Sequence, residues 1–409
     1  MTFALDHRLP PPANTPLDVA PWFDDVLPGL LAINGAAAGR AADRLGLPPL
    51  VLEVDGWRGG LVVRHGRLEI DVDDESALTL ELSASEFADW VRHHRTARSL
   101  VISRDAVLRG GSLERLEEWE LVLRQIVEAS PVHEPGAIDF RDTAGEPLDL
   151  GRIFGPDDDP AEIAHFLREA GFLHLRGWID PADMAIVADD IDRALPHYAP
   201  EDGRSWWATL EDGSQACVRL QHFIEHSPTT ARILSSDRWD QLRRACAGDE
   251  ELVQGPVEGT CVEALIKPVG VVAGVSDVPW HRDCAFGGHP YKCSGTVVGI
   301  SVTDGTEESG LLRAVAGSHR ASSLPEPTWQ GNDLPVVALA TVAGDVTVHT
   351  TCTSHEALPP TSRARKVMYT GFGLPPSPFD DEARTAKTMA LRNGVHKIAS
   401  QPRNAERVR

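Results

Sequence analysis

The chain has too few basic residues for a typical nucleic-acid-binding protein. Its 409 residues contain 39 Lys and Arg against 61 Asp and Glu, which gives a formal net charge of −22 at pH 7. Phosphate binding depends on clusters of Lys and Arg that should show in such a total. The composition therefore argues against a nucleic-acid partner, without excluding a local basic groove.

Long apolar runs are also lacking. At the N-terminus, Asp6 and Arg8 precede Pro10, with no apolar core and no small-residue cleavage site of a secretory signal. The longest uncharged run in this region, 26–39, has 14 residues and is interrupted by Pro28. That run is too short to span a bilayer. We therefore expect no membrane span.

Cysteine is sparse and confined to the second half of the chain. The six cysteines show no compact disulfide or zinc spacing: Cys217, Cys246, Cys261, Cys284, Cys293 and Cys352. This pattern predicts free thiols in a reducing cytoplasm.

The remaining composition, 42% hydrophobic and 24% charged, is that of a soluble globular protein with two or three domains. Alternation of Leu68 and Ile70 with acidic residues predicts a strand. Ser83 or Ser85 then precedes a helix with Trp90 on its apolar face, and a longer amphipathic helix follows. These patterns predict an α+β domain over residues 1–130.

Frequent Pro and Gly residues mark 131–158 as a linker. The second domain, 159–386, is expected to open with a helix that is capped by Asp159 and ends near Ala170, followed by a strand at 171–175. Residues 387–409 form a basic C-terminal tail.

The most informative residues are His281 and Asp283. They follow a strand-like apolar stretch, and residues i and i+2 of an extended chain point to the same side, so both can reach one metal ion while Arg282 points away. With the distant His355 they make two imidazoles and one carboxylate, the set that holds non-haem Fe(II) and leaves three positions open. A lone His-x-Asp is a weak signal because it occurs often by chance.

The motifs that follow the His-x-Asp pair make this signal more specific. Downstream of the His-x-Asp pair come, in order, Gly310-Leu311, Gly317-Ser318-His319, Gly344-Asp345, His355 and Arg365. This order closely resembles the phytanoyl-CoA dioxygenase family of Fe(II)/2-oxoglutarate oxygenases, over about residues 160–372.

The resemblance implies a mainly-β catalytic domain with flanking helices, a double-stranded β-helix or cupin-like jelly roll. It makes His281, Asp283 and His355 the iron ligands. Arg365 would bind the far carboxylate of the co-substrate 2-oxoglutarate, for which a planar guanidinium is suited, and Lys267 would add a second cation. The cofactors implied are Fe(II), 2-oxoglutarate and O2.

Three features depart from the family pattern. Ala357 stands two residues after the distal His, where the family usually has a serine that helps to bind the co-substrate. The spacing to Arg365 is one residue shorter than is common, so Arg363 or Lys366 are alternative partners. His349 falls on the same strand face as His355 and is either a neighbour of the metal set or itself a ligand.

Asp283 also bears on the reaction. Related halogenases have a small residue at this position, where chloride binds the metal, so a carboxylate here favours hydroxylation of an unactivated C–H bond. Desaturation or ring formation is compatible with the same residues.

The first domain resembles sterol carrier proteins over about residues 50–130, through the Gly59-Gly60 strands, the helix with Trp90 and the Gly110-Gly111 turn. An unrelated α+β domain is the alternative. The resemblance implies a small hydrophobic substrate, such as a lipid, terpenoid, steroid, polyketide or acyl thioester. Two other functions stay open: a lipid carrier with an inactive oxygenase domain, and an iron enzyme that does not use 2-oxoglutarate.

Overall fold

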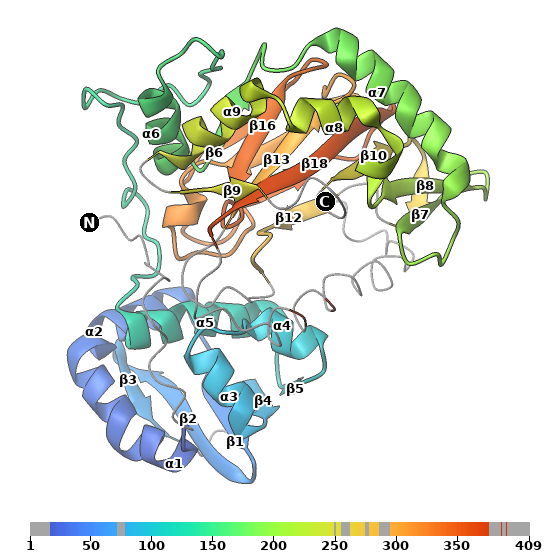
Figure 1. Cartoon of the computed structure of the whole chain (residues 1–409). Helices are drawn as coiled ribbons and strands as arrows, with labels where there is room; N and C mark the ends of the chain where they lie inside the picture. Colours follow the sequence, from blue (N-terminus) through green and yellow to red (C-terminus); the bar gives the residue numbers. More distant parts are fainter. Residues whose placement is uncertain are drawn as a thin grey trace.

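The computed structural model describes residues 17–71, 78–248, 251–254, 262–274, 278–285 and 295–375, together with Ala386 and Ala390. Two hydrophobic cores organise these residues. One lies almost wholly within residues 19–132, and the other extends from Phe154 to Phe372. Figure 1 shows the first part in blue and cyan below the second, which is coloured green to red.

The N-terminal part is a five-stranded sheet with helices. The helices are α1 (Val19–Pro21), the π-helical turn η1 (Trp22–Val26), α2 (Leu27–Leu45), α3 (Ala84–Val91), α4 (Ala97–Ile102) and α5 (Leu113–Glu128). The strands are β1 (Leu50–Val54), β2 (Trp57–Arg64), β3 (Arg67–Ile70), β4 (Leu78–Leu82) and β5 (Ala106–Arg109). Their order is β3-β2-β1-β4-β5, and only the pair β1 and β4 is parallel.

Local sequence explains how the helices of this part begin. The Ser83 hydroxyl accepts the backbone N–H of Glu86, so Ser83 rather than Ser85 caps α3. Ser112 caps α5 in the same way. Hydroxyl caps satisfy backbone donors that a helix start leaves unpaired. The expected helix around Trp90 and the longer helix after it are confirmed.

Aromatic rings fill the centre of this part. The ring of Trp22 lies with its centroid 4.9 Å from that of Phe23 and 5.3 Å from that of Phe87, both edge-to-face. Phe23 also contacts Trp57, with centroids 4.2 Å apart. Such offset contacts add stability beyond the buried area.

The C-terminal part is mainly β with flanking helices, as the sequence predicts. Its helices are α6 (Pro160–Ala170), α7 (Pro181–Ala194), α8 (Pro228–Leu234) and α9 (Asp237–Ala247), with 3-10 turns η2 (Leu195–His197), η3 (Phe223–His226) and η4 (Ser318–Arg320). The strands are β6 (Phe172–Leu175), β7 (Ser205–Leu210), β8 (Gln215–Leu220), β9 (Val253–Gln254), β10 (Glu263–Lys267), β11 (Val271–Ala273), β12 (Val278–His281), β13 (Gly295–Ser301), β14 (Leu312–Val315), β15 (Val336–Leu339), β16 (Val346–Thr350), β17 (His355–Ala357) and β18 (Arg365–Gly373).

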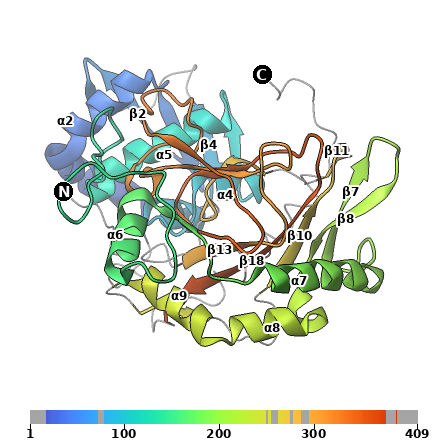
Figure 2. The same ribbon diagram turned by 90° about the horizontal axis from the view of Figure 1, so that it is seen from above.

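These strands form two sheets. The larger has the order β11-β7-β8-β10-β18-β13-β16-β6, with β9 beside β18, and the smaller has the order β12-β17-β14-β15. Helices α7, α8 and α9 lie along one face of the larger sheet in both views (Figures 1 and 2). The expected cap at Asp159 and the helix end at Ala170 are confirmed.

Strand alternation separates the two faces of the larger sheet. Met368 and Phe372 of β18 belong to the core under the helices, and Phe372 contacts Trp239 of α9 with centroids 5.4 Å apart. Because successive side chains alternate, Arg365 and Tyr369 point to the opposite face. That face meets the smaller sheet.

One loop joins the two cores. Leu324 and Trp329, from the segment between β14 and β15, are buried in the N-terminal core. The indole N–H of Trp329 donates to Glu118 of α5 over 2.9 Å, and Val132 bridges to Ser322. The N-terminal part is therefore packed against the C-terminal part through shared apolar residues.

Two sequence expectations have definite outcomes here. In the part of the chain that the structure covers, no helix has the length and apolarity needed to span a membrane. Cys217 and Cys246 are free, but Cys352 is disulfide-bonded, so the expectation of free thiols is wrong for that residue. The sequence gave no sign of this bond because the cysteines show no compact disulfide spacing. The thiol of Cys284 is a separate neighbour of Cys352, with their Sγ atoms 3.5 Å apart.

Candidate active site

The structure brings His281, Asp283 and His355 together. His281 ends β12 and His355 begins β17, and the two residues are direct partners in an antiparallel pair. One ligand atom from each of the three residues lies within 4.8 Å of the others. Arg282 points away, as predicted, and donates to the carbonyl oxygen of Ser318. The three side chains thus converge from two neighbouring strands of the smaller sheet.

Main-chain carbonyls fix the orientation of both imidazoles. Nδ1 of His281 lies 2.8 Å from the carbonyl oxygen of Pro279, and Nδ1 of His355 lies 2.9 Å from that of Thr353. A carbonyl oxygen can only accept, so Nδ1 carries the proton in each ring. Nε2 of each ring faces Asp283, at 3.6 Å for His281 and 3.8 Å for His355.

The protonation states suit a cation. Burial raises the pKa of the Asp283 carboxyl, but the neighbouring His355, His281 and His349 outweigh this effect and hold it well below its usual range. Burial and the neighbouring imidazoles hold the pKa of His355 well below its usual range. An ionised carboxylate and a neutral imidazole are the forms that bind a metal.

His349 lies beside this set rather than within it. It is buried on β16, and its Nε2 lies 3.2 Å from Oδ2 of Asp283. Its ring centroid is 4.0 Å from that of His355. The three residues that converge as a possible metal set do not include it. The contact favours the interpretation that His349 positions Asp283 over the alternative that it is a ligand.

Arg365 is buried on the inner face of the larger sheet. Only 4% of the residue is exposed, and among the described residues its Nε has no hydrogen-bond partner. The alternative cations are engaged elsewhere: Lys366 binds Asp192 of α7 at 2.6 Å, and the mostly exposed Arg363 lies near Asp304. Of the three cations considered from the sequence, only Arg365 lies buried on the inner face.

Lys267 is next to Arg365, because the two are direct partners in the pair of β10 and β18. It is buried, and its ammonium group donates to the carbonyl oxygens of Leu358 and Gly310. This contact ties β10 to the segment after β17, a structural role that the sequence did not predict. The predicted contact with a co-substrate stays a prediction.

Tyr369 is an inner-face residue that sequence reasoning missed. Burial raises the pKa of its phenol, while the Arg365 guanidinium lowers it and the Asp283 carboxylate raises it. The phenol therefore lies within electrostatic reach of both. Its spacing of four from Arg365 on one strand was the available signal, since residues i and i+4 of a strand share a face.

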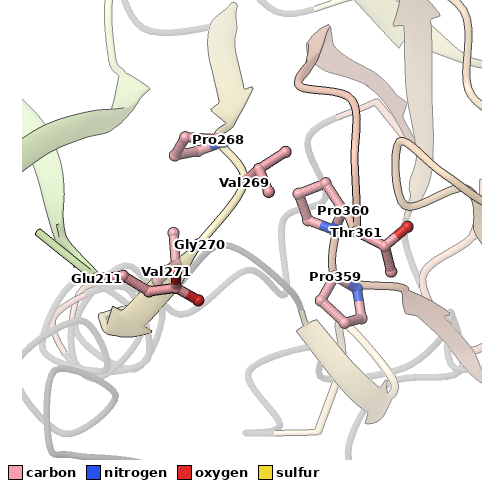
Figure 3. Close-up of a pocket in the computed structure, with 8 residues that line it drawn as sticks. All are labelled: Glu211, Pro268, Val269, Gly270, Val271, Pro359, Pro360 and Thr361. Carbon is pink, nitrogen blue, oxygen red and sulfur yellow. The ribbon is translucent and has the colours of Figure 1, made fainter.

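A surface pocket of about 220 Å³ lies outside this site. Figure 3 shows it between the turn Pro268 to Val271 and the segment Pro359 to Thr361, with Glu211 at one side. None of the predicted site residues lines it. Its two walls are the chain segments that follow Lys267 and Leu358. The pocket therefore lies on the outer side of the hydrogen bond from the Lys267 ammonium group to the Leu358 carbonyl oxygen.

Comparison with known proteins identifies the family of this part of the chain. Residues 167–368 match the sequence model of the family described as phytanoyl-CoA dioxygenase. No curated protein matches the chain.

Solved structures give more distant similarities. AviO1 from Streptomyces viridochromogenes Tue57 is 22% identical, with 54% of this chain and 98% of that one covered and a TM-score of 0.42. The epimerase SnoN, in complex with Fe3+, alpha ketoglutarate and nogalamycin RO, is 22% identical over 53% of this chain and 85% of its own, with a TM-score of 0.41. EctD from S. alaskensis, with 2-oxoglutarate and 5-hydroxyectoine, is 18% identical over 62% and 90%, with a TM-score of 0.43. Similarity at this level says nothing about the substrate of this chain.

The donor set fits the group that this family uses. Two imidazoles and one carboxylate leave three positions open on Fe(II). The buried guanidinium of Arg365, with its orphaned Nε, fits a dianionic co-substrate such as 2-oxoglutarate. The chain is a 2-oxoglutarate-dependent non-haem iron oxygenase. Its residues 167–368 are a domain of the phytanoyl-CoA dioxygenase family.

Proposed function

We propose that this oxygenase hydroxylates an unactivated C–H bond of a small, hydrophobic metabolite. His281, Asp283 and His355 hold Fe(II) within a double-stranded β-helix, and Arg365, assisted by the charge of Lys267, binds the far carboxylate of 2-oxoglutarate. The observation that carries the proposal is the buried Arg365, whose Nε has no partner in the described part of the chain, on the sheet face that meets the converging His-Asp-His set.

The chain's own residues have defined tasks in this proposal. Iron with 2-oxoglutarate and O2 supplies the oxidising chemistry when bound. The carbonyl oxygens of Pro279 and Thr353 hold the two imidazoles with Nε2 toward the metal position. Asp283 occupies the position that a halide would need, which supports hydroxylation over halogenation.

Turnover of 2-oxoglutarate tests the proposal without knowledge of the substrate. Fe(II)-loaded protein should form succinate slowly from 2-oxoglutarate and O2. Arg365→Gln should raise the KM for 2-oxoglutarate by one to three orders of magnitude, because a buried charge-assisted contact is lost. Arg363→Gln is the matched control and should leave the KM unchanged, since Arg363 is mostly exposed.

The opposite pattern, with a raised KM in Arg363→Gln and a normal KM in Arg365→Gln, would indicate that Arg363 binds the co-substrate. Absence of any succinate from metal-loaded wild type would favour a lipid carrier with an inactive oxygenase domain. Product formation that does not depend on 2-oxoglutarate would favour a different iron enzyme.

The N-terminal part supports the hydrophobic substrate only through its resemblance to sterol carrier proteins. Its centre is filled by the rings of Trp22, Phe23, Phe87 and Trp57, so an apolar ligand would need to bind beside or displace them. Organic extraction of purified protein followed by mass spectrometry tests this part. A co-purifying lipid, terpenoid, steroid, polyketide or acyl thioester is expected, and the absence of such a ligand together with no binding of a fluorescent fatty acid would count against it.

A further inference from the structure

One segment of the chain, 318–329, contacts both the N-terminal core and the residues next to the metal set. It begins with η4, after β14, and continues toward β15. In its second half, Leu324 and Trp329 are 5% and 6% exposed and belong to the N-terminal core. The indole N–H of Trp329 donates to Glu118 of α5. The first half of the segment binds residues that adjoin the metal ligands.

Arg282 connects the first two ligands to this segment, because it stands between the His and the Asp of the His-x-Asp pair. Its Nη2 donates to the carbonyl oxygens of Ser318 and Ala321 over 3.0 Å and 3.3 Å. The hydroxyl of Ser323 lies 3.1 Å from the same nitrogen. Hydrogen bonds from a charged donor are stronger than those from a neutral one. These contacts therefore hold the end of β12, where both ligands lie.

Ser354 connects the third ligand to the same segment. It directly precedes His355, and its backbone N–H donates to the hydroxyl of Ser318 over 2.8 Å. Its own hydroxyl donates to the carbonyl oxygen of Pro325. Ser354 and Ser318 are both buried, at 1% and 2% exposure. The two strands that carry the metal ligands are thus held by one segment in addition to their own pairing.

The N-terminal part also reaches this region directly. The Thr96 hydroxyl, at the start of α4, donates to the carbonyl oxygen of Ala285, close behind the His-x-Asp pair. The Glu117 carboxylate of α5 lies within electrostatic reach of Arg282, where its charge opposes the lowering of the pKa by burial. Residues 167–368, which match the family, do not include the N-terminal part. These contacts are therefore a feature of this chain that the family match does not cover.

We propose that the N-terminal part supports the metal site: through segment 318–329 it sets the position of the three iron ligands, with Arg282 and Ser354 as the positioning residues. This inference rests on the proposed function, because it concerns the same iron set. Residues that hold metal ligands in place commonly change metal affinity by about ten- to a hundredfold when they are removed. A substitution in the N-terminal core that loosens the segment should therefore weaken iron binding.

Stabilisation of the fold alone is the competing explanation. Buried contacts of this kind raise the free energy of unfolding whether or not they affect the metal. The two roles are separable, because a substitution elsewhere in the same core lowers stability without removing a contact of the segment. Iron affinity and stability are therefore measured on the same variants.

Two variants test the inference by anaerobic competition for Fe(II) with a chromophoric chelator. Ser354→Ala removes the hydroxyl that donates to Pro325, and Leu324→Ala removes apolar contacts within the N-terminal core. Each should weaken Fe(II) binding by about tenfold, at a temperature where urea unfolding shows the metal-free variant to be folded. The visible charge-transfer band of the 2-oxoglutarate chelate should also shift in both variants, because the ligands are held differently.

Two controls carry the same substitutions at other buried positions. Leu52→Ala shortens a leucine of β1 in the N-terminal core, and Ser205→Ala removes a hydroxyl of β7 that also donates to a main-chain carbonyl. Both should unfold at lower urea concentration than wild type while Fe(II) affinity and the band stay unchanged. Leu324→Val leaves a smaller cavity and takes the place of Leu324→Ala if that variant does not fold.

Wild-type Fe(II) affinity in either Ser354→Ala or the Leu324 variant would overturn the inference, as would an equal loss of affinity in Leu52→Ala. In these cases the proposed function stands as long as wild type binds Fe(II) and 2-oxoglutarate. If wild type does not bind Fe(II), the proposed function fails and the supporting role of the N-terminal part fails with it.

Discussion

At the scale of single residues, the candidate site depends on side chains that are held by their neighbours. Asp283 accepts from His349 through Oδ2, which leaves its other oxygen toward His281. Neighbours of metal ligands commonly set ligand orientation and metal affinity. His349 is therefore expected to fix the direction of the carboxylate without binding the metal.

His349→Leu should weaken Fe(II) binding by about 10- to 100-fold, because the hydrogen bond that holds Oδ2 of Asp283 is lost. His349→Gln places an amide donor near the same point and should recover most of the affinity. The measurement is anaerobic competition with a chromophoric chelator. A loss in both variants as large as that in His355→Ala would instead make His349 a ligand.

The sequence predicted the converging residues well and their surroundings poorly. The His-x-Asp pair was visible because two residues of one strand share a face by local geometry alone. To favour Arg365 over Arg363 required the position where β18 begins, because Arg365 is in the strand and buried whereas Arg363 lies in the exposed segment before it. Tyr369 was missed although its spacing of four from Arg365 on one strand was visible, because only the fold brings its phenol within electrostatic reach of Asp283.

At the scale of elements, Asp345 anchors the start of β16. This buried carboxylate accepts from His174 of β6 at 2.9 Å, from Arg176 at 2.9 Å and from the N–H of Val342 at 3.1 Å. Burial raises the Asp345 pKa, but the hydrogen bonds from His174 and Arg176 outweigh it and lower the pKa below its usual value. The Gly-Asp motif thus joins an edge strand to the turn that precedes the strand of His349.

Asp345→Asn should reduce the free energy of unfolding at neutral pH by about 2–4 kcal/mol, because the amide cannot replace a buried charge that faces two donors. A carboxyl with a lowered pKa in the folded state contributes stability above its unfolded pKa and loses it as pH falls through the folded pKa. The difference between wild type and variant should therefore shrink once the pH falls below about 4. Urea unfolding at several pH values measures both effects.

Asp139→Asn is the control for this prediction, because Asp139 forms an exposed pair with Arg141 and should change stability by less than about 1 kcal/mol. Equal effects of the two substitutions would show that the Asp345 network contributes little.

At the scale of the whole molecule, the two cores are linked through the segment between β14 and β15. The segment follows Gly317-Ser318-His319, yet Trp329 within it packs among N-terminal residues and is 6% exposed. A second link lies close to the metal set, where the Thr96 hydroxyl at the start of α4 donates to the carbonyl oxygen of Ala285 over 2.5 Å. Sequence patterns could not reveal these links, because the paired residues are 189 and 211 positions apart in the chain.

Trp329→Ala should lower the free energy of unfolding by about 3–5 kcal/mol, since a buried indole and its hydrogen bond to Glu118 are lost. It should also weaken the coupling of the two cores, so that a single unfolding transition separates into two. Trp329→Phe keeps most of the packing and should behave more like wild type. Thermal unfolding followed by calorimetry is the measurement, and a single unshifted transition in Trp329→Ala would contradict the link.

The central claim is that His281, Asp283 and His355 hold iron that 2-oxoglutarate chelates. Its most direct test is anaerobic titration of Fe(II)-loaded protein with 2-oxoglutarate, following the weak visible charge-transfer band of the chelate in wild type and in His355→Ala. The account predicts a band in wild type that is absent from the variant. A folded, metal-loaded wild type without the band, or an equal band in His355→Ala, would contradict it.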